Sequence, residues 1–300
     1  MKHKRKTHKG LLFILSVILL VTGILLYGVI NSKTVRVVYG TATLKNLDYR
    51  LDGVKILYLS DLKISNGSEA ADAVKLIKKL NALSPDLILL GGDISGDSLI
   101  NDLRVRLGIL RAEDVQRGKK EARDQFLLDM NEINAKNGIY AVLGDGDLPL
   151  TQEERARSNI RFLYDETIYV NIDGAALPLY GEYSGNNFRL GTENRGAMVV
   201  LFHDPSGYKT AALKASERSS DADSYLFLSA HLLGGQMRIG NRFAYLSEQN
   251  REFTANSDAK GLYSDGSQIR MLLSQGIGCE GLPLRYGSAP TAYLITLKRA

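Results

Sequence analysis

The chain has 300 residues, of which 44% are apolar and 24% charged, values that fit a globular protein and exclude a disordered one. Its single cysteine, Cys279, excludes an internal disulfide and a cysteine-based zinc cluster. The net charge of +5 equals the charge of the five lysines and arginines within residues 1–10, so the rest of the chain is neutral overall and no nucleic-acid partner is expected.

Residues 11–30 (LLFILSVILLVTGILLYGVI) contain no charged side chain and follow this basic tail. A helix of that length spans about 30 Å, the thickness of the hydrocarbon core of a bilayer. We therefore predict a basic cytoplasmic tail at 1–10 and a transmembrane anchor at 11–30. No small-residue cleavage site follows, which favours an uncleaved anchor over a cleaved signal peptide. Because the basic residues precede the helix, residues 33–300 are expected outside the cytoplasm, at the cell membrane.

The next segments alternate between strand and helix patterns. Residues 31–53 are predicted to be a connector with a first strand, and residues 54–300 one domain. Apolar strands are expected at 54–61, 87–93 and 139–143, and a helix from an N-cap at Ser68 to about Leu83. A longer charged helix is expected before Gly138. This alternation predicts an α/β fold with parallel strands covered by helices.

The second half of the chain is richer in strand patterns. Runs of β-branched and aromatic residues at 168–172, 197–202, 225–229 and 292–297 are each bounded by turn signals. No linker or internal repeat divides residues 40–300, so a single domain is expected there.

Five side chains with metal-binding chemistry stand where apolar strands end: Asp61, Asp93, Asp145, His203 and His231. The carboxyl ends of strands in an α/β sheet are where ligands bind. Carboxylates and neutral imidazoles suit zinc, manganese or iron. Each residue alone is more often an ordinary loop residue, but five such coincidences favour a metal site.

Other nucleotide, calcium and hydrolase motifs are not found. The chain has no GxGxxG after a strand and no GxxxxGK[ST]. Residues 145–147 do not continue into a calcium loop, and no Gly-x-Ser-x-Gly elbow supplies a serine nucleophile.

Residues 54–297 resemble the calcineurin-like metallophosphoesterases, in the branch of membrane-associated bacterial phosphohydrolases. The resemblance rests on five motifs in the family's order: 59–63 (LSDLK), 85–93 (PDLILLGGD), 138–147 (GIYAVLGDGD), 201–205 (LFHDP) and 230–236 (AHLLGGQ). The segments 275–278 (QGIG) and 282–285 (LPLR) are also similar to this branch. The resemblance implies a four-layer α/β/β/α sandwich of two mixed sheets, preceded here by the transmembrane helix, with 54–300 as the metallophosphoesterase-like domain.

Members of the family hold two metal ions that clamp a phosphoester. The resemblance assigns one ion to Asp93, Asp145, His203 and His231, all of which are able to bind metal. It therefore implies one retained site for a single divalent metal, Mn, Fe or Zn.

The neighbouring metal site departs from the family pattern. The resemblance assigns it Asp61, Asp93 and two histidines, and those histidines are Lys63 and Leu233 in this chain. Leucine has no donor atom and an ammonium has no lone pair, so we expect this site to be lost, with Asp61 as its remnant. Lys63 is expected either to place a positive charge beside Asp61 and Asp93 or to point to solvent. The histidine of the third motif is also replaced, by Gly146.

Two functions remain open from the sequence. The first is a membrane-anchored, extracytoplasmic phosphoesterase with one metal and reduced activity, in which Lys63 or Arg285 clamps the phosphate and lipid head groups or cell-wall phosphodiesters are reasonable substrates. The alternative is a catalytically inactive relative that binds a phosphorylated envelope ligand or a protein partner.

Overall fold

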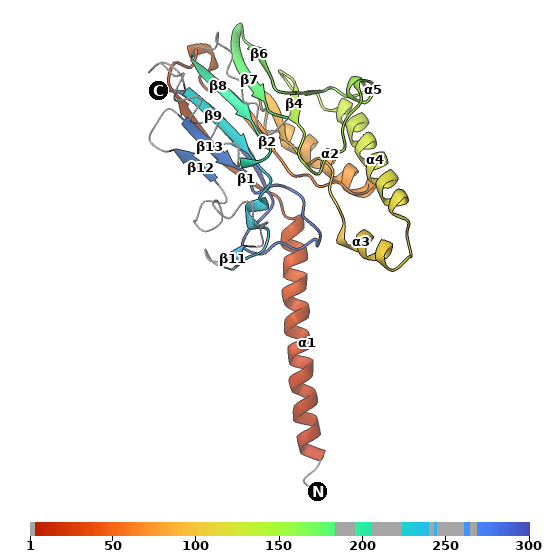
Figure 1. The fold of residues 1–300 in the computed structure, drawn as a ribbon. Helices are drawn as coiled ribbons and strands as arrows, with labels where there is room; N and C mark the ends of the chain where they lie inside the picture. Colours follow the sequence, from red (N-terminus) through yellow and green to blue (C-terminus); the bar gives the residue numbers. More distant parts are fainter. Residues whose placement is uncertain (1–3, 184–195, 206–223, 240–242, 245–260, 265–268) are drawn as a thin grey trace.

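The computed structural model describes residues 4–183, 196–205, 224–239, 243–244, 261–264 and 269–300, and Figure 1 shows their arrangement. The first element, α1 (Lys4–Lys33), extends away from one end of the domain. Within it, Lys9–Lys33 is long and apolar enough to cross a membrane, and its large apolar side chains are exposed. Among the described helices it is the one with these properties.

The first sheet is mixed, in the order β1-β14-β2-β3-β4-β5. The pairs β1/β14, β2/β3, β3/β4 and β4/β5 are parallel, whereas β14 and β2 are antiparallel. Its strands are β1 (Arg36–Leu44), β2 (Lys55–Leu59), β3 (Leu87–Gly91), β4 (Ile139–Val142), β5 (Ile160–Phe162) and β14 (Thr291–Arg299).

The second sheet is also mixed, in the order β12-β13-β9-β8-β7-β6, with antiparallel pairs at its two edges. Its strands are β6 (Glu166–Ile172), β7 (Ala175–Gly181), β8 (Ala197–Leu201), β9 (Ser224–Ser229), β12 (Gly261–Ser264) and β13 (Ile269–Leu273). A separate short ribbon pairs β10 (Arg238–Ile239) with β11 (Phe243–Ala244).

Helices connect the strands of the first sheet. They are α2 (Gly67–Asn81), α3 (Leu99–Arg106), α4 (Ala112–Asp129) and α5 (Gln152–Ala156), with 3-10 turns η1 (Tyr49–Leu51) and η2 (Met130–Glu132). A further 3-10 turn, η4 (Leu233–Gly235), follows β9 of the second sheet. The predicted N-cap at Ser68 is wrong by two residues. The Asn66 side chain caps α2 by accepting from the amide of Glu69, since an amide oxygen serves a helix start as well as a hydroxyl.

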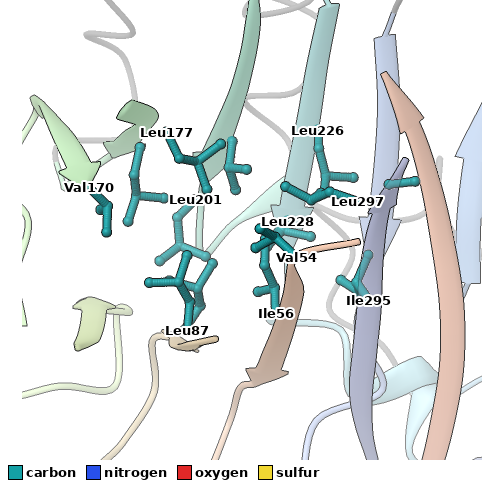
Figure 2. Close-up of a cluster of buried hydrophobic side chains, with 14 of the residues drawn as sticks. Val54, Ile56, Leu87, Val170, Leu177, Leu201, Leu226, Leu228, Ile295 and Leu297 are labelled. Carbon is teal, nitrogen blue, oxygen red and sulfur yellow. The ribbon is translucent and has the colours of Figure 1, made fainter. Parts of the chain in front are cut away.

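Two apolar cores lie on the two faces of the first sheet. One fills the space between the sheets, where side chains of both meet, among them Ile56, Leu87, Leu177 and Leu226 (Figure 2). The other lies under α2 and α4, where Ile77 and other apolar residues cover the outer face of the sheet. Burying one such aliphatic side chain contributes about 1.5–3 kcal/mol, so these cores hold the strand ends in fixed positions.

The predicted α/β class, with two mixed sheets, flanking helices and one apolar N-terminal helix, is confirmed. The first strand expected within 31–53 is β1, and its full-length pairing with β14 makes it part of the first sheet. The compact domain therefore begins near Arg36, ahead of residue 54. A helical layer over the outer face of the second sheet was also expected; the connecting segments 184–195 and 206–223 lie outside the described residues.

Candidate metal centre

The five predicted residues lie at the carboxyl ends of strands from both sheets. Asp61, Asp93 and Asp145 follow β2, β3 and β4 of the first sheet, and His203 and His231 follow β8 and β9 of the second. Because parallel strands end at the same edge of a sheet, the loops after them meet where the two sheets face each other. The structure thereby brings residues more than 100 positions apart in the chain into one cluster.

Asp93, His203 and His231 present ligand atoms that all lie within 4.8 Å of one another. His203 Nε2 is 3.2 Å from Asp93 Oδ2, and His231 Nδ1 is 3.3 Å from His203 Nε2. The two imidazole rings are almost perpendicular, at 85°. Nitrogen and oxygen donors thus converge on one point, as the sequence led us to expect.

The backbone orients the His203 ring for this role. Its Nδ1 lies 2.8 Å from the carbonyl oxygen of Gly91 at the end of β3, a distance at which an Nδ1–H donates to that oxygen. With the proton on Nδ1, the lone pair of neutral imidazole is on Nε2, which faces Asp93 and His231. The second ring position is therefore free to bind a metal ion.

In the protein without metal, His203 is held in its protonated form. Burial alone would lower the pKa of this imidazole, but the charge of Asp93 and the hydrogen bond to it outweigh burial and raise the pKa to about 10. Burial also opposes ionisation of Asp93, and His203 and Lys63 together hold the pKa of that carboxyl well below its ordinary value. A proton and a metal ion therefore compete for the same nitrogen.

Asp145 is the exposed member of the cluster, and 67% of its side chain is accessible to solvent. Its two carboxylate oxygens lie 3.5 Å from His203 Nε2 and 3.5 Å from His231 Nδ1. It therefore stands at the mouth of the site, beside both imidazoles, where it could complete the ligand set of Asp93, His203 and His231.

The loop that carries Asp145 fits closely against Asp93. Gly146 donates its amide to Asp93 Oδ1 at 2.7 Å, and a Cβ on Gly144 would stand 2.3 Å from the same oxygen. Asp147 holds the loop by accepting the amides of Gly144 and Ser95, at 2.9 and 2.7 Å. The glycine at 144 is thus required for close approach, and the backbone amide of residue 146 orients the shared carboxylate.

The residues of this site fit one divalent ion. The donor set contains two imidazoles and a buried carboxylate, with a second carboxylate at its edge, which suits zinc, manganese or iron. The carbonyl oxygen of Gly91 supplies the outer hydrogen bond that metal-binding histidines usually make.

Lys63 does not point to solvent. Its ammonium lies 2.6 Å from Asp93 Oδ2 and 2.6 Å from Glu280 Oε2, and only 9% of its side chain is exposed. Burial by itself would lower the pKa of this amine, but the charges of Asp93, Asp61 and Glu280 raise it above its ordinary value. Lys63 therefore places a fixed positive charge at Asp93 Oδ2, the same oxygen that His203 Nε2 approaches.

Asp61 and Leu233 lie together in the region of that lost site. Both approach Gly276: a Cβ there would stand 2.7 Å from Leu233 Cδ2 and 2.8 Å from Asp61 Cβ. Asp61 is fully buried, its Oδ2 accepts from Ser60, and its Oδ1 has no hydrogen-bond partner among the described residues. Burial raises the pKa of this carboxyl. The apolar side chain of Leu233 thus lies near the Asp61 carboxylate, at the position where the family has a second histidine.

Strained backbone is concentrated in these loops. Ten described residues other than glycine have a positive φ, and six of them belong to the site loops: Asp61, Lys63, Asp93, His231, Leu233 and Gln236. Each such conformation costs about 1–3 kcal/mol and persists only where the surrounding structure enforces it. The surrounding fold therefore holds these residues in backbone conformations that they would rarely adopt on their own.

Arg285 does not fit the role of phosphate clamp. Its side chain is fully buried, and its guanidinium donates to the carbonyl oxygens of Leu233, Gln275 and Gly278. These carbonyls belong to the loops beside Asp61 and Lys63. A guanidinium whose donors are used in this way supports the loops and has no face turned to a ligand.

The sequence did not indicate Glu280. It lies on the loop after β13, outside every motif, yet its carboxylate pairs with Lys63. Gln236, in the fifth motif, holds this loop by donating to the carbonyl of Glu280 and accepting its amide, at 3.0 and 2.7 Å. The one signal for Glu280 in the sequence was Lys63 in the first motif, because a buried lysine requires a carboxylate partner.

Comparisons with known proteins agree with the motifs. No family model matches the chain. The chain is 24% identical over 94% of its length to a zebrafish (Danio rerio) transmembrane protein with a metallophosphoesterase domain, of which it spans 62%. It is 27% identical over 96% of its length to an uncharacterized metallophosphoesterase of Campylobacter jejuni, covering 70% of that protein.

A third relative, an uncharacterized metallophosphoesterase of Bacillus subtilis, is 25% identical over 84% of this chain and 82% of its own length. The similarity in all three cases includes most of the domain that carries the site. Taken with the two mixed sheets and the convergence of Asp93, His203 and His231, these relatives support a calcineurin-like metallophosphoesterase family for this chain.

Proposed function

We propose that this protein is a membrane-anchored phosphoesterase that works with one divalent metal ion and hydrolyses phosphoesters slowly. The observation that carries the proposal is the position of Asp93, whose Oδ2 lies 3.2 Å from His203 Nε2 and 2.6 Å from the Lys63 ammonium. Family members clamp a phosphoester between two cations. Here one cation would be a bound metal and the other is a lysine.

The metal ligands would be Asp93, His203 and His231, with Asp145 at the mouth of the site. A divalent ion held there supplies Lewis-acid polarisation of a phosphoryl oxygen. The carbonyl of Gly91 fixes the His203 ring, and the amide of Gly146 fixes Asp93, so the ligands are oriented before anything binds.

Lys63 is the proposed phosphate clamp. It is held by a buried partner, Asp93, and by Glu280, whose side chain is 46% exposed. A substrate phosphate could replace the Glu280 carboxylate at the ammonium, because both are anions and Glu280 is accessible to solvent. The ammonium would then donate to a phosphoryl oxygen while Asp93 keeps it in place.

Slow turnover is expected because the third-motif histidine is Gly146, which has no side chain to protonate a leaving group. A lost general acid costs about 10²–10⁴ in rate. The leaving alkoxide would have to take its proton from water, so esters with acidic leaving groups should react fastest.

The membrane part of the proposal rests on α1. Its apolar stretch is long enough to span a bilayer, and the basic residues lie before it. We infer an N-terminus in the cytoplasm and a domain on the outer side of a bacterial cell membrane, close to phosphorylated lipid head groups and cell-wall phosphodiesters.

The test uses the full chain in detergent, prepared without chelators. Elemental analysis should find one metal ion per chain, and an activated aryl phosphodiester should be hydrolysed slowly in the presence of manganese. His203→Ala should lose both properties. His8→Ala, which changes a histidine of the N-terminal tail, is the matched control and should keep both. Metal-independent turnover, or turnover unaffected by His203→Ala, would contradict the proposal.

A second candidate is a binding protein without turnover. It is favoured by the same replacements, since Lys63, Leu233 and Gly146 all stand where the family has a catalytic or metal-binding side chain. It would bind a phosphorylated envelope ligand or a protein partner. One bound metal ion with phosphate binding and no hydrolysis would support this candidate over the enzyme.

A further inference from the structure

A group of exposed aliphatic side chains lies on α3 and the turn after it. Leu99, Ile100, Leu103, Leu107 and Ile109 are each 45–65% exposed, and no residue of α3 is buried. Folding of this domain therefore gives no reason for these side chains to be apolar. Exposed apolar side chains gathered within eleven residues are typical of a surface that another phase or partner covers.

Four of these residues form one face, the apolar arc: Leu99, Ile100, Leu103 and Leu107. With 3.6 residues per turn they fall within an arc of about 100° around the helix. Arg104 and Arg106 flank that arc on its two sides, and Asn101 and Val105 lie opposite it. Aliphatic residues between two arginines are the pattern of a helix that lies at a membrane interface.

The face of α3 opposite the apolar arc is the one turned toward the domain. Asn101 and Val105 are the two partly buried residues in the helix, whereas the apolar arc is exposed. Asn101 lines a cavity between α2, α3 and α4, together with Asn66, Asp114 and Gln125. A surface helix ordinarily buries its apolar face against its own protein. This one presents the apolar face outward.

The loop at residues 281–286 contacts both the start of α3 and the last turns of α1. At the start of α3, the amide of Leu99 donates to the carbonyl of Gly281 at 3.4 Å. Further along the same loop, Arg285 donates its amide to Gly28 and the Tyr286 hydroxyl donates to Ile24, at 3.1 and 2.7 Å. Figure 1 shows α3 at the end of the domain from which α1 leaves. The apolar arc is thus held near the place where a membrane would begin.

We propose that the apolar arc of α3 lies in the interfacial layer of the bilayer that α1 spans, with Arg104 and Arg106 at the lipid phosphates. This inference rests on the proposed function, because it requires α1 to be a membrane anchor. Each arginine near an anionic surface contributes attraction, and its aliphatic stem remains in the apolar layer. Attachment at α1 and α3 together fixes the orientation of the domain on the lipid surface.

Tryptophan fluorescence tests this directly, since the chain contains no tryptophan. Three variants of the full chain each receive a single one: Leu103→Trp in the apolar arc, Leu19→Trp in α1, and Tyr169→Trp on β6, where the native side chain is 56% exposed. Each is reconstituted into vesicles of phosphatidylcholine and phosphatidylglycerol, with and without brominated acyl chains.

We expect bromine to remove most of the emission of Leu19→Trp and Leu103→Trp and to leave that of Tyr169→Trp unchanged. Emission of Leu103→Trp should also shift to shorter wavelength on reconstitution from detergent. Adding Arg104→Glu and Arg106→Glu to Leu103→Trp should reduce its quenching in these anionic vesicles and leave that of Leu19→Trp unchanged.

The three variants distinguish failure of the inference about α3 from failure of the proposed anchor α1. Quenching of Leu19→Trp without quenching of Leu103→Trp would overturn the inference and leave the anchor in place. No quenching of Leu19→Trp would overturn the anchor itself. A Leu103→Trp emission that is shielded from acrylamide but unaffected by bromine would mean that protein covers the apolar arc, and would also overturn the inference.

Discussion

Two groups of side chains meet at Asp93 Oδ2 and satisfy this carboxylate in different ways. On the imidazole side, His203 and His231 offer nitrogen donors that could hold an ion together with the carboxylate. On the lysine side, Lys63 supplies a covalently attached positive charge at 2.6 Å. The candidate metal site thus lies beside a position where the chain itself provides the cation, and the two share one buried residue.

With Lys63 in the place of a metal ion, as we propose, the comparison explains how half of a two-metal site can be replaced while the fold is kept. A carboxylate buried beside Asp61 would be costly without a cation, because isolated buried charges are strongly unfavourable. The Lys63 ammonium neutralises Asp93 permanently, and Glu280 is its second carboxylate partner. Unlike a metal, an ammonium is not removed by chelators, so this side of the site should be indifferent to metal supply.

The largest expected effect follows from removing the shared residue. Asp93→Ala would leave Lys63 and His203 without their common partner, and breaking a buried pair in this way costs about 3–5 kcal/mol. The variant should also bind no metal. Chemical unfolding of the detergent-solubilised chain and elemental analysis measure the two effects. Glu132→Gln, which breaks the exposed pair with Lys78, is the control and should change stability by less than about 1 kcal/mol. Equal effects of the two variants would contradict this account of Asp93.

Restoring the second metal site sharpens the comparison. Lys63→His together with Leu233→His should raise the metal content from one ion to two per chain, because Asp61 and Asp93 are already in place. The single variants are the matched controls, and each should bind one ion. Elemental analysis after dialysis gives the stoichiometry. A double variant that folds and still binds one ion would show that Lys63 does not stand in for a metal.

A smaller effect is the pH dependence of stability, which comes from His203 on the imidazole side of Asp93. The pKa of His203 is raised from 6.5 to about 10 in the metal-free protein. Its contribution is therefore fully present below pH 6.5 and is lost as the pH rises toward 10, with a slope of at most about 1.4 kcal/mol per pH unit. Unfolding measured with chelator between pH 6 and pH 10 should show this loss.

His203→Gln should remove the loss of stability over that range, since glutamine does not titrate. Saturating metal should remove it too, because a bound ion takes the place of the proton on Nε2. If the chelated wild-type protein were equally stable at pH 6.5 and pH 9.5, the raised pKa of His203 would be refuted.

The retained side of the site was far easier to predict than the replaced side. Asp93, His203 and His231 each follow an apolar strand, and strand ends in such sheets converge, so their meeting could be expected from the sequence and is confirmed. The pattern could not distinguish a buried Lys63 from an exposed one. That depended on Glu280, whose position is set by loop contacts with Gln236 that leave no periodic signal.

The dependence on loop contacts also explains why the predictions for Arg285 and Ser68 were wrong. An arginine in a loop that resembles the family fits a phosphate clamp by charge alone, but the loops beside it leave three carbonyl oxygens to be satisfied, and Arg285 satisfies them. The start of α2 depends on which of several capping residues has the extended backbone, and that residue is Asn66. The apolar strands could be predicted from the residues they contain, whereas the contacts between loops depend on the whole fold.

The smallest effect concerns Glu280, which we propose occupies the place of a substrate phosphate at Lys63. Glu280→Gln removes its charge while keeping its size. Because this side chain is half-exposed, stability should change by less than about 1 kcal/mol. The affinity for inorganic phosphate should nevertheless rise a few-fold, since phosphate no longer competes with a carboxylate for the ammonium. Titration calorimetry measures this without requiring turnover.

Glu153→Gln is the matched control for that measurement, because its side chain, on α5, is 77% exposed and pairs with Arg157 instead of Lys63. It should leave phosphate affinity unchanged. A weaker affinity in Glu280→Gln would mean that Glu280 holds Lys63 in its binding geometry instead of competing with phosphate. Adding Lys63→Met to Glu280→Gln should abolish the gain, because the competition exists only while residue 63 carries a charge. The lysine side of the site would then be the part that recognises the anion.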